Sequence, residues 1–381
     1  MGQIISPEQA IAADQAIAKA IAIAGTDDFG AEGWREGLTR ALDAFAHMPL
    51  KPEVRDASLN RVIADLATRL RIEQWYKDHP ETNAQTVEGP VFVFGLPRTG
   101  TTATVGMLAL DPRFRFLRAW EGTNPLPPPI AAEEASDPRV VAARQAASAH
   151  PHVHIFDPDG PEEDPVMLGG YAMHSYYGAL PVPDDYTAWW RNAGAGSYYS
   201  YLERILKLLQ SHRPPHLWLL KSPLHLFHLK TIARQYPNAK FVMTHRDPVK
   251  VIASVASLHT GLHEERSLPS SIDGLAAGPR YLAFWAEGMR RGLAARAEIG
   301  EHRFIDVKNA DVVKRPAETF ARIYKHLEMP LAPSLLREIE DYNSRNAPGK
   351  FGEHSYTAEQ YGLTGQKIRT AFGHYIERFR L

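Results

Sequence analysis

The stretch VFVFGLPRTGTT, residues 91–102, decides how the rest of this sequence is interpreted. Its first four residues are β-branched or aromatic and do not alternate with polar residues, which is typical of a strand buried on both faces. A glycine-containing turn follows and leads into a helical segment that ends at Asp111-Pro112. A strand, a glycine loop and a helix N-terminus in this order present backbone N–H groups and the positive end of a helix dipole. The loop is therefore expected to bind a phosphate group.

This loop differs from the Walker A loop of nucleotide hydrolases at one position. The Walker A pattern is GxxxxGK[ST], in which the lysine reaches the β- and γ-phosphates. Gly95 and Gly100 have the required spacing, but Thr101 stands in place of the lysine and the cation is Arg98, inside the loop. A P-loop kinase or NTPase, which would need Mg²⁺ and that lysine, is kept as an alternative, as is a tight turn that binds nothing.

The order of strand and loop recurs further along the chain. Apolar strands are expected at 217–220, 240–244 and 303–307, and Lys221 and Arg246 follow the first two of these strands closely. Strands that alternate with helices and carry polar residues at their carboxyl ends indicate a parallel sheet with the ligand at that edge. The predicted fold class is thus α/β, with a P-loop-type parallel sheet flanked by helices.

Two further regions are expected around this sheet. Residues 1–86 are interpreted as a helical N-terminal region packed on the core, which covers a sheet face or mediates contacts in a homodimer. Residues 87–381 are assigned to one α/β domain, whose insert at 121–213 is rich in Pro, Tyr and Trp. The insert is expected to form a lid or a wall of an acceptor site. The N-terminal helices are expected at about 7–24, 33–46 and 57–77.

Composition excludes several functional classes. The 381 residues include 43 Lys and Arg against 44 Asp and Glu, and a formal net charge of −1 leaves no general cationic field for a nucleic acid. The chain has no Cys, which excludes disulfides, thiolate catalysis and Cys-ligated zinc. We find no integral membrane segment and no signal peptide, so a cytoplasmic location is expected. The start MGQIIS fits a myristoylation pattern, which leaves lipidation of Gly2 open.

The motifs resemble those of sulfotransferases that use 3′-phosphoadenosine 5′-phosphosulfate (PAPS), above all the bacterial branch related to the tyrosylprotein sulfotransferases. GLPRTGTT, residues 95–102, resembles the 5′-phosphosulfate loop of that family, and THRDPVKVIASV, residues 244–255, resembles its 3′-phosphate segment. In that segment an Arg is followed eight residues later by a Ser, as Arg246 is by Ser254 here (254 − 246 = 8). The resemblance spans about residues 25–375.

This resemblance implies a reaction and a set of site residues. The enzyme would move a sulfuryl group from PAPS to a hydroxyl of a small acceptor, release PAP and require no metal. Arg98 and Lys221 are expected as the fixed cations at the reacting group, because fixed cations can replace Mg²⁺. The residues implied to bind the cofactor are Pro97, Arg98, Thr99, Gly100, Thr101, Thr102, Arg246, Ser254 and Lys350.

The catalytic base is left open between two residues. Glu121 aligns approximately with the catalytic glutamate of the bacterial and tyrosylprotein branches, two positions adrift, and His225 lies near Lys221. The small-molecule cytosolic branch has a His two residues after the Lys, but position 223 is Pro here. The base is therefore predicted to be Glu121 or His225.

The acceptor is predicted only as a class. Near-neutral charge and the Tyr- and Trp-rich insert favour a lipophilic alcohol or phenol over a charged polysaccharide, whose binding usually needs a basic groove. A non-catalytic member of the fold, which binds a nucleotide or a protein partner, is the second alternative to the enzyme.

Overall fold

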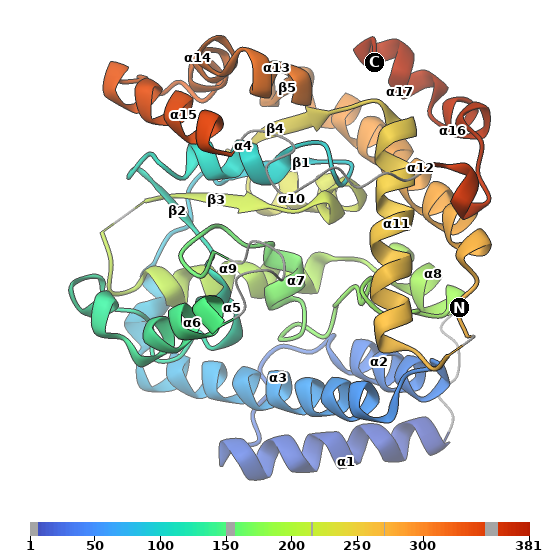
Figure 1. The fold of residues 1–381 in the computed structure, drawn as a ribbon. Helices are drawn as coiled ribbons and strands as arrows, with labels where there is room; N and C mark the ends of the chain where they lie inside the picture. Colours follow the sequence, from blue (N-terminus) through green and yellow to red (C-terminus); the bar gives the residue numbers. More distant parts are fainter. Residues whose placement is uncertain (1–6, 150–156, 215, 270, 347–356) are drawn as a thin grey trace.

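The computed structural model of the chain describes residues 7–149, 157–214, 216–269, 271–346 and 357–381. A five-stranded sheet with the order β2-β3-β1-β4-β5 lies at its centre (Figure 1). All four neighbouring pairs of strands are parallel, which confirms the predicted fold class. The strands are β1 (Val91–Gly95), β2 (Phe114–Phe116), β3 (Leu217–Lys221), β4 (Lys240–His245) and β5 (Phe304–Lys308).

The central strand β1 is buried over its whole length, as the run of apolar residues indicates. It pairs with β3 on one side and β4 on the other, and Gly95 lies opposite Thr244 at the carboxyl end of β4. The chain passes from β1 to β2 and β3 on one side and then crosses to β4 on the other. The carboxyl end of β1 is therefore a switch point, where open α/β sheets bind their ligands.

The edge strand β2 was not among the predicted strands. Its sequence is only Phe-Arg-Phe, and it pairs with the start of β3. A strand of three residues offers too short a pattern to recognise, so its formation depends on pairing with β3.

Helices cover both faces of the sheet. Side chains of β1 alternate between the faces. Val91 and Val93 belong to the apolar cluster with α4 (Thr101–Leu108), α14 (Pro316–His326) and α15 (Pro333–Arg345). Phe92 and Phe94 belong to the larger cluster with α9 (Gly196–Gln210) and α12 (Gly274–Ile299). The helices after the loop are α4 (Thr101–Leu108), α10 (Leu229–Gln235), α11 (Pro248–Arg266), α12 (Gly274–Ile299), α13 (Asn309–Lys314), α14 (Pro316–His326), α15 (Pro333–Arg345), α16 (Gly365–Ala371) and α17 (Gly373–Phe379), with short 3₁₀ helices η3 (Pro223–Phe227), η4 (Glu301–Arg303) and η5 (Glu359–Tyr361).

The insert lies between the sheet and the N-terminal helices, so it separates these helices from the sheet face that they were expected to cover (Figure 1). Arg69 donates a hydrogen bond to the Tyr171 carbonyl (2.9 Å), and the Tyr76 hydroxyl donates to the Arg204 carbonyl (2.6 Å). The N-terminal elements are α1 (Pro7–Ala24), α2 (Arg35–His47), α3 (Pro52–Asp78) and η1 (Pro80–Ala84). The insert contains α5 (Ala119–Thr123), η2 (Ala131–Ser136), α6 (Pro138–Ala149), α7 (Asp164–Leu168), α8 (Asp184–Asn192) and α9 (Gly196–Gln210).

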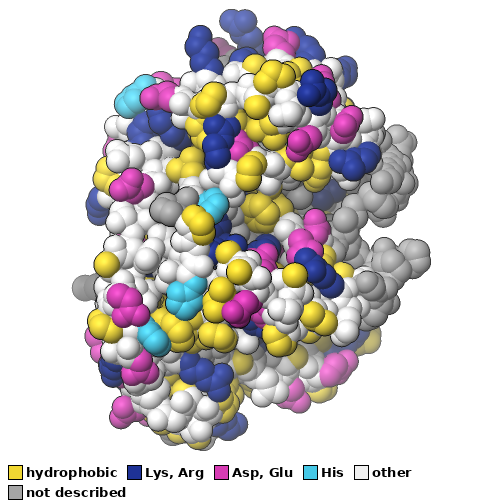
Figure 2. All heavy atoms as spheres, turned by 90° about the vertical axis from the view of Figure 1, so that its left-hand side faces the viewer, with side chains coloured by type: hydrophobic (Ala, Val, Ile, Leu, Met, Phe, Trp, Pro, Cys, Tyr) yellow, Lys and Arg dark blue, Asp and Glu magenta, His cyan; other side chains and the backbone are white. Residues whose placement is uncertain are grey.

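No helix in the described part of the chain is long and apolar enough to span a bilayer. On the face shown in Figure 2, Lys and Arg side chains are interspersed with Asp and Glu rather than gathered into one basic surface. This distribution agrees with the balanced charge of the sequence.

Candidate active site

The loop between β1 and α4 folds back tightly over the end of the strand. Gly100 has φ 89° and precedes α4, and a Cβ added there would lie 2.3 Å from Asn309 Nδ2. A Cβ at Gly95 would lie 2.3 Å from the carbonyl oxygen of Thr244, so both positions need glycine. Arg98 has φ 64°, a conformation that costs a residue other than glycine about 1 kcal/mol or more. Other contacts must therefore hold this loop.

Thr99 supplies these contacts. Its hydroxyl donates to the Leu96 carbonyl (2.6 Å) and is 2.7 Å from the hydroxyl of Thr244 on β4. Thr99 is fully buried, so its side chain holds the loop and is not exposed to a ligand. Thr102 is exposed on the first turn of α4, where backbone N–H groups have no helical partner. Pro97 is half-buried and Thr101 is buried.

Arg98, Arg246 and Ser254 come together beside this loop. Arg98 Nε donates to Ser254 Oγ (3.3 Å), and Arg246 Nη1 donates to the Arg98 carbonyl (3.0 Å). Asp247 caps α11 by accepting a hydrogen bond from the Val249 amide (3.0 Å). The eight-residue spacing of Arg246 and Ser254 thus brings both residues to the same loop.

Lys221 ends β3 at the same edge of the sheet, and a carboxylate from the insert faces it. Lys221 Nζ is 3.8 Å from Glu163 Oε1, and the Ser222 hydroxyl donates to Glu163 Oε2 (3.0 Å). Burial raises the pKa of Glu163, while Lys221 and Ser222 act in the opposite direction. The Glu163 side chain keeps 28% of its surface exposed and Lys221 6%. Glu163 is therefore an accessible carboxylate next to a buried cation.

Glu121 has a different environment. Its side chain is fully buried, and it accepts hydrogen bonds from Arg115 Nη2 (2.7 Å) and Arg118 Nη2 (2.9 Å). Burial alone would raise the pKa of Glu121, but the two arginines outweigh this effect and lower it. A buried carboxylate held by two guanidinium groups is a structural ion pair and offers no free lone pair to an acceptor.

His225 is also fully buried and takes part in a closed network. Its Nε2 is 3.1 Å from Asp164 Oδ1, its Nδ1 is 2.9 Å from the Tyr199 hydroxyl, and Tyr198 donates to Asp164 Oδ2 (2.8 Å). All partners are satisfied when Nε2 donates to Asp164 and Nδ1 accepts from Tyr199. Neither ring nitrogen is then left to take a proton from an acceptor.

Glu163 was not found from the sequence. It lies 58 residues before Lys221 (221 − 163 = 58), and Glu162, Glu163, Asp164 and Pro165 together have the pattern of a helix N-terminus. Its contact with Lys221 depends on how the insert packs, so only a systematic search of acidic residues in the insert could have suggested it.

Two expectations concern residues outside the described ranges. Lys350 falls within 347–356 and Gly2 within 1–6. Among the residues that the structure does describe, no group of three or more His, Asp or Glu side chains is arranged to hold a metal ion.

A family model matches the part of the chain that contains this site. The model of the "Sulfotransferase family" matches residues 90–333. The chain belongs to this family. The matched range contains the β1 loop, Glu163, Lys221 and the Arg246–Ser254 pair. The prediction of a sulfotransferase, and hence of a transferase enzyme, is confirmed.

Similar proteins come from mycobacteria. Omega-hydroxy-beta-dihydromenaquinone-9 sulfotransferase Stf3 of Mycobacterium bovis is 23% identical over 315 residues, which cover 78% of this chain and 76% of that protein. The crystal structure of sulfotransferase STF9 from Mycobacterium avium has a TM-score of 0.88 and 27% identity, and the match covers 99% of this chain and 97% of that one. Sulfotransferase STF1 from Mycobacterium tuberculosis H37Rv has a TM-score of 0.82 and 29% identity, with 95% and 98% covered.

Proposed function

We propose that this sulfotransferase uses PAPS as donor and a small lipophilic alcohol or phenol as acceptor. The observation that carries the proposal is the meeting of Arg98, Arg246 and Ser254 at the carboxyl edge of the sheet, where the β1 loop supplies an anion cradle. Two elements that each suit a phosphate and contact each other would fit a nucleotide with phosphate groups at the 3′ and 5′ positions of its ribose.

The two elements receive different roles in this proposal. The loop at 97–102 and the N-terminus of α4 would bind the 5′-phosphosulfate through backbone N–H groups. Arg246 and Ser254 would bind the 3′-phosphate, because a guanidinium and a hydroxyl both donate to phosphate oxygens. Lys350 remains a further candidate for this cofactor.

The reaction is an in-line displacement at sulfur. The acceptor oxygen forms a bond to sulfur while the bond from sulfur to the bridging oxygen breaks, and the electron pair stays on the 5′-phosphate of PAP. Arg98 and Lys221 stabilise the charge that develops on this oxygen and on the sulfuryl group. No metal is needed, because these cations are fixed before the reaction begins.

We assign the role of base to Glu163 in place of Glu121 or His225. Glu163 is partly exposed beside Lys221, whereas the other two side chains are fully buried in closed networks. A pKa raised by burial favours proton uptake by the Glu163 carboxylate when the acceptor hydroxyl attacks. Lys221 lowers the pKa of Glu163 against the effect of burial, and in this proposal it also faces the reacting group.

The lipophilic acceptor class has two supports. A relative, Stf3, is named for a hydroxylated dihydromenaquinone, which is a lipophilic molecule. Glu163 belongs to the aromatic-rich insert, so the segment that supplies the base also supplies aromatic side chains near it. A cytoplasmic location and a homodimer stay predictions, as does the role of the insert as a wall of the acceptor site.

The proposal is tested by following label from ³⁵S-PAPS into a panel of phenols and long-chain alcohols, with EDTA present. We expect transfer to at least one apolar acceptor by the wild-type protein and transfer slower by about 10²- to 10⁴-fold by Glu163→Gln. Transfer that requires added metal, or that occurs only to charged sugars, would contradict the proposal. PAP binding without transfer to any acceptor would instead favour a non-catalytic member of the fold.

A further inference from the structure

We propose that the C-terminal helix α17 positions Arg246 for the 3′-phosphate, with Tyr375 as the positioning residue. The inference rests on the function proposed above for Arg246. It goes beyond that function because it assigns part of the selectivity for a 3′-phosphorylated nucleotide to a helix more than 100 residues away in the sequence (375 − 246 = 129).

A chain of hydrogen bonds joins the sheet to α17 through His245, the residue before Arg246. His245 Nε2 is 2.8 Å from Asp306 Oδ1, and His245 Nδ1 is 3.2 Å from the Tyr375 hydroxyl. Arg246 follows His245 directly in the chain, so a contact that fixes His245 also fixes the start of Arg246. Asp306 accepts, so His245 Nε2 donates and Nδ1 accepts from the Tyr375 hydroxyl. Every donor in the chain then has an acceptor.

The groups in this chain are held rigidly. His245 and Tyr375 are buried, and the ring of Phe379 stacks on His245 with centroids 4.0 Å apart. Arg296 pairs with Asp306 through Nη1 (2.6 Å) and Nη2 (2.9 Å). Buried side chains with satisfied hydrogen bonds have little freedom, so the Tyr375 hydroxyl is a fixed point for His245 and, through the chain, for Arg246.

The C-terminal helices also contact the residue after Arg246. Arg369 of α16 lies 3.7 Å from Asp247, the residue that caps α11. The Arg380 carbonyl accepts from Lys308 Nζ at the end of β5 (3.1 Å). Residues on both sides of Arg246 are therefore bound by the same C-terminal segment, while the Arg246 side chain reaches the Arg98 carbonyl.

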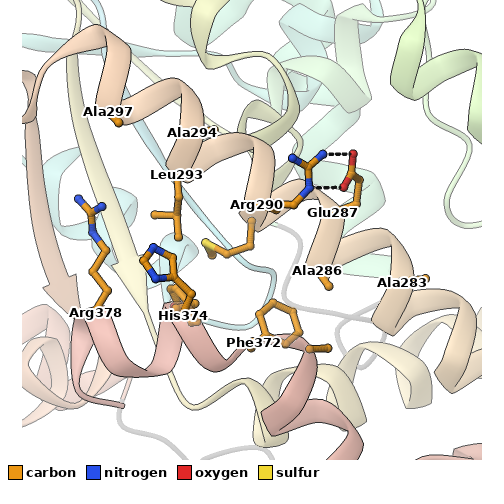
Figure 3. Close-up of a pocket in the computed structure, with 13 residues that line it drawn as sticks. Ala283, Ala286, Glu287, Arg290, Leu293, Ala294, Ala297, Phe372, His374 and Arg378 are labelled. Atoms are coloured by element: carbon orange, nitrogen blue, oxygen red, sulfur yellow. Dashed lines mark hydrogen bonds and ion pairs between the residues drawn. The ribbon is translucent and has the colours of Figure 1, made fainter.

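On its other side the C-terminal segment is packed less closely. A pocket of about 630 Å³ lies between it and α12, with Phe372, His374 and Arg378 across from Leu293 and the alanines of α12 (Figure 3). Tyr375 lines this pocket, while its hydroxyl bonds to His245 on the sheet. The Tyr375 side chain therefore lies between this pocket and the sheet.

The test compares PAP with adenosine 5′-monophosphate, which lacks the 3′-phosphate. Tyr375→Phe removes only the hydroxyl, and we expect the Kd for PAP to rise about 3- to 10-fold, as for one lost hydrogen bond. The Kd for the monophosphate should not change. Phe379→Leu, which removes the ring stacked on His245, is the second variant in case the first does not fold. Tyr324→Phe is the matched control, because its buried hydroxyl bonds to Asp111 away from this edge.

Each outcome decides the proposal. A selective loss of PAP affinity in Tyr375→Phe or Phe379→Leu, but not in Tyr324→Phe, supports it. An unchanged ratio of the two affinities in both variants overturns it while leaving Arg246 as the 3′-phosphate ligand. A wild-type protein that binds PAP no better than the monophosphate would overturn the role of Arg246 and the positioning proposal with it.

Discussion

Arg246 Nη1 donates a hydrogen bond to the backbone carbonyl of Arg98, and the two atoms are 3.0 Å apart. Arg98 in turn donates from Nε to Ser254 Oγ, so the loop after β1 and the start of α11 are joined by two contacts. A ligand that binds one of these elements is therefore held next to the other. This relationship links the two proposed phosphate sites.

Replacement of Arg246 by Ala should weaken PAP binding by about 2–4 kcal/mol, because the 3′-phosphate loses a charge-assisted partner. The affinity is measured by calorimetry. Arg234→Ala, which removes an exposed arginine from α10, makes the same change in net charge and should have little effect. Equal PAP affinities for the two variants would exclude Arg246 from the 3′-phosphate site.

Glu163→Gln should lower kcat by about 10²- to 10⁴-fold, the usual contribution of a general base. The side chain keeps nearly the same shape and can still accept from Ser222, so PAP affinity and melting temperature should stay close to those of the wild type. Single-turnover rates with ³⁵S-PAPS measure the effect. A variant with full activity would show that Glu163 is not the base.

Glu121→Gln should lower the stability of the protein and leave its turnover nearly unchanged. It removes the carboxylate that pairs with Arg115 and Arg118, and leaving a buried charge without its partner costs about 3–5 kcal/mol of stability. We expect a lower melting temperature but a nearly normal turnover for each folded molecule. If stability is unchanged and turnover is lost, Glu121 acts in catalysis as the sequence first suggested.

The pH dependence of kcat should have an acidic limb set by Glu163. Burial raises the pKa of Glu163, and only the ionised carboxylate can act as base. Turnover should therefore fall as the pH is lowered through a pKa above the ordinary range for glutamate, and it should be highest above that pKa. The limb should vanish from the residual activity of Glu163→Gln. Persistence of the limb in that variant would assign it to another group.

Lys221→Ala should shift this limb as well as lower kcat. Lys221 is the main group that lowers the Glu163 pKa against the effect of burial, so its removal should move the acidic limb to higher pH. Lys230→Ala, at an exposed position on α10, is the control. A lower kcat with an unmoved limb would mean that Lys221 acts on the reacting group but not on Glu163.

The sequence predicted those parts of the fold that depend on local pattern. The runs at 91–94, 217–220 and 240–244 are apolar and bounded by turn residues, and each forms a strand. The edge strand at 114–116 was missed because three residues carry no pattern and the strand depends on its pairing with β3.

The site residues that the sequence could predict are likewise those in short local motifs. Arg98, Arg246 and Ser254 lie in short motifs next to strand ends, so their proximity follows from a parallel sheet whose strands end at one edge. Glu163 reaches Lys221 only through the packing of a long insert, and no spacing in the sequence indicates this contact. Glu121 was rejected as the base because its side chain is fully buried. Burial of a single carboxylate cannot be determined from its neighbours in the sequence.

Calorimetric titration of the purified protein with PAP in EDTA, beside a titration with ATP and Mg²⁺, tests the central claim most directly. Micromolar or tighter PAP binding together with weak ATP binding is the predicted result, because the loop lacks the Walker lysine and Arg246 lies beside it for a 3′-phosphate. Metal-dependent binding of ATP without affinity for PAP would contradict the account.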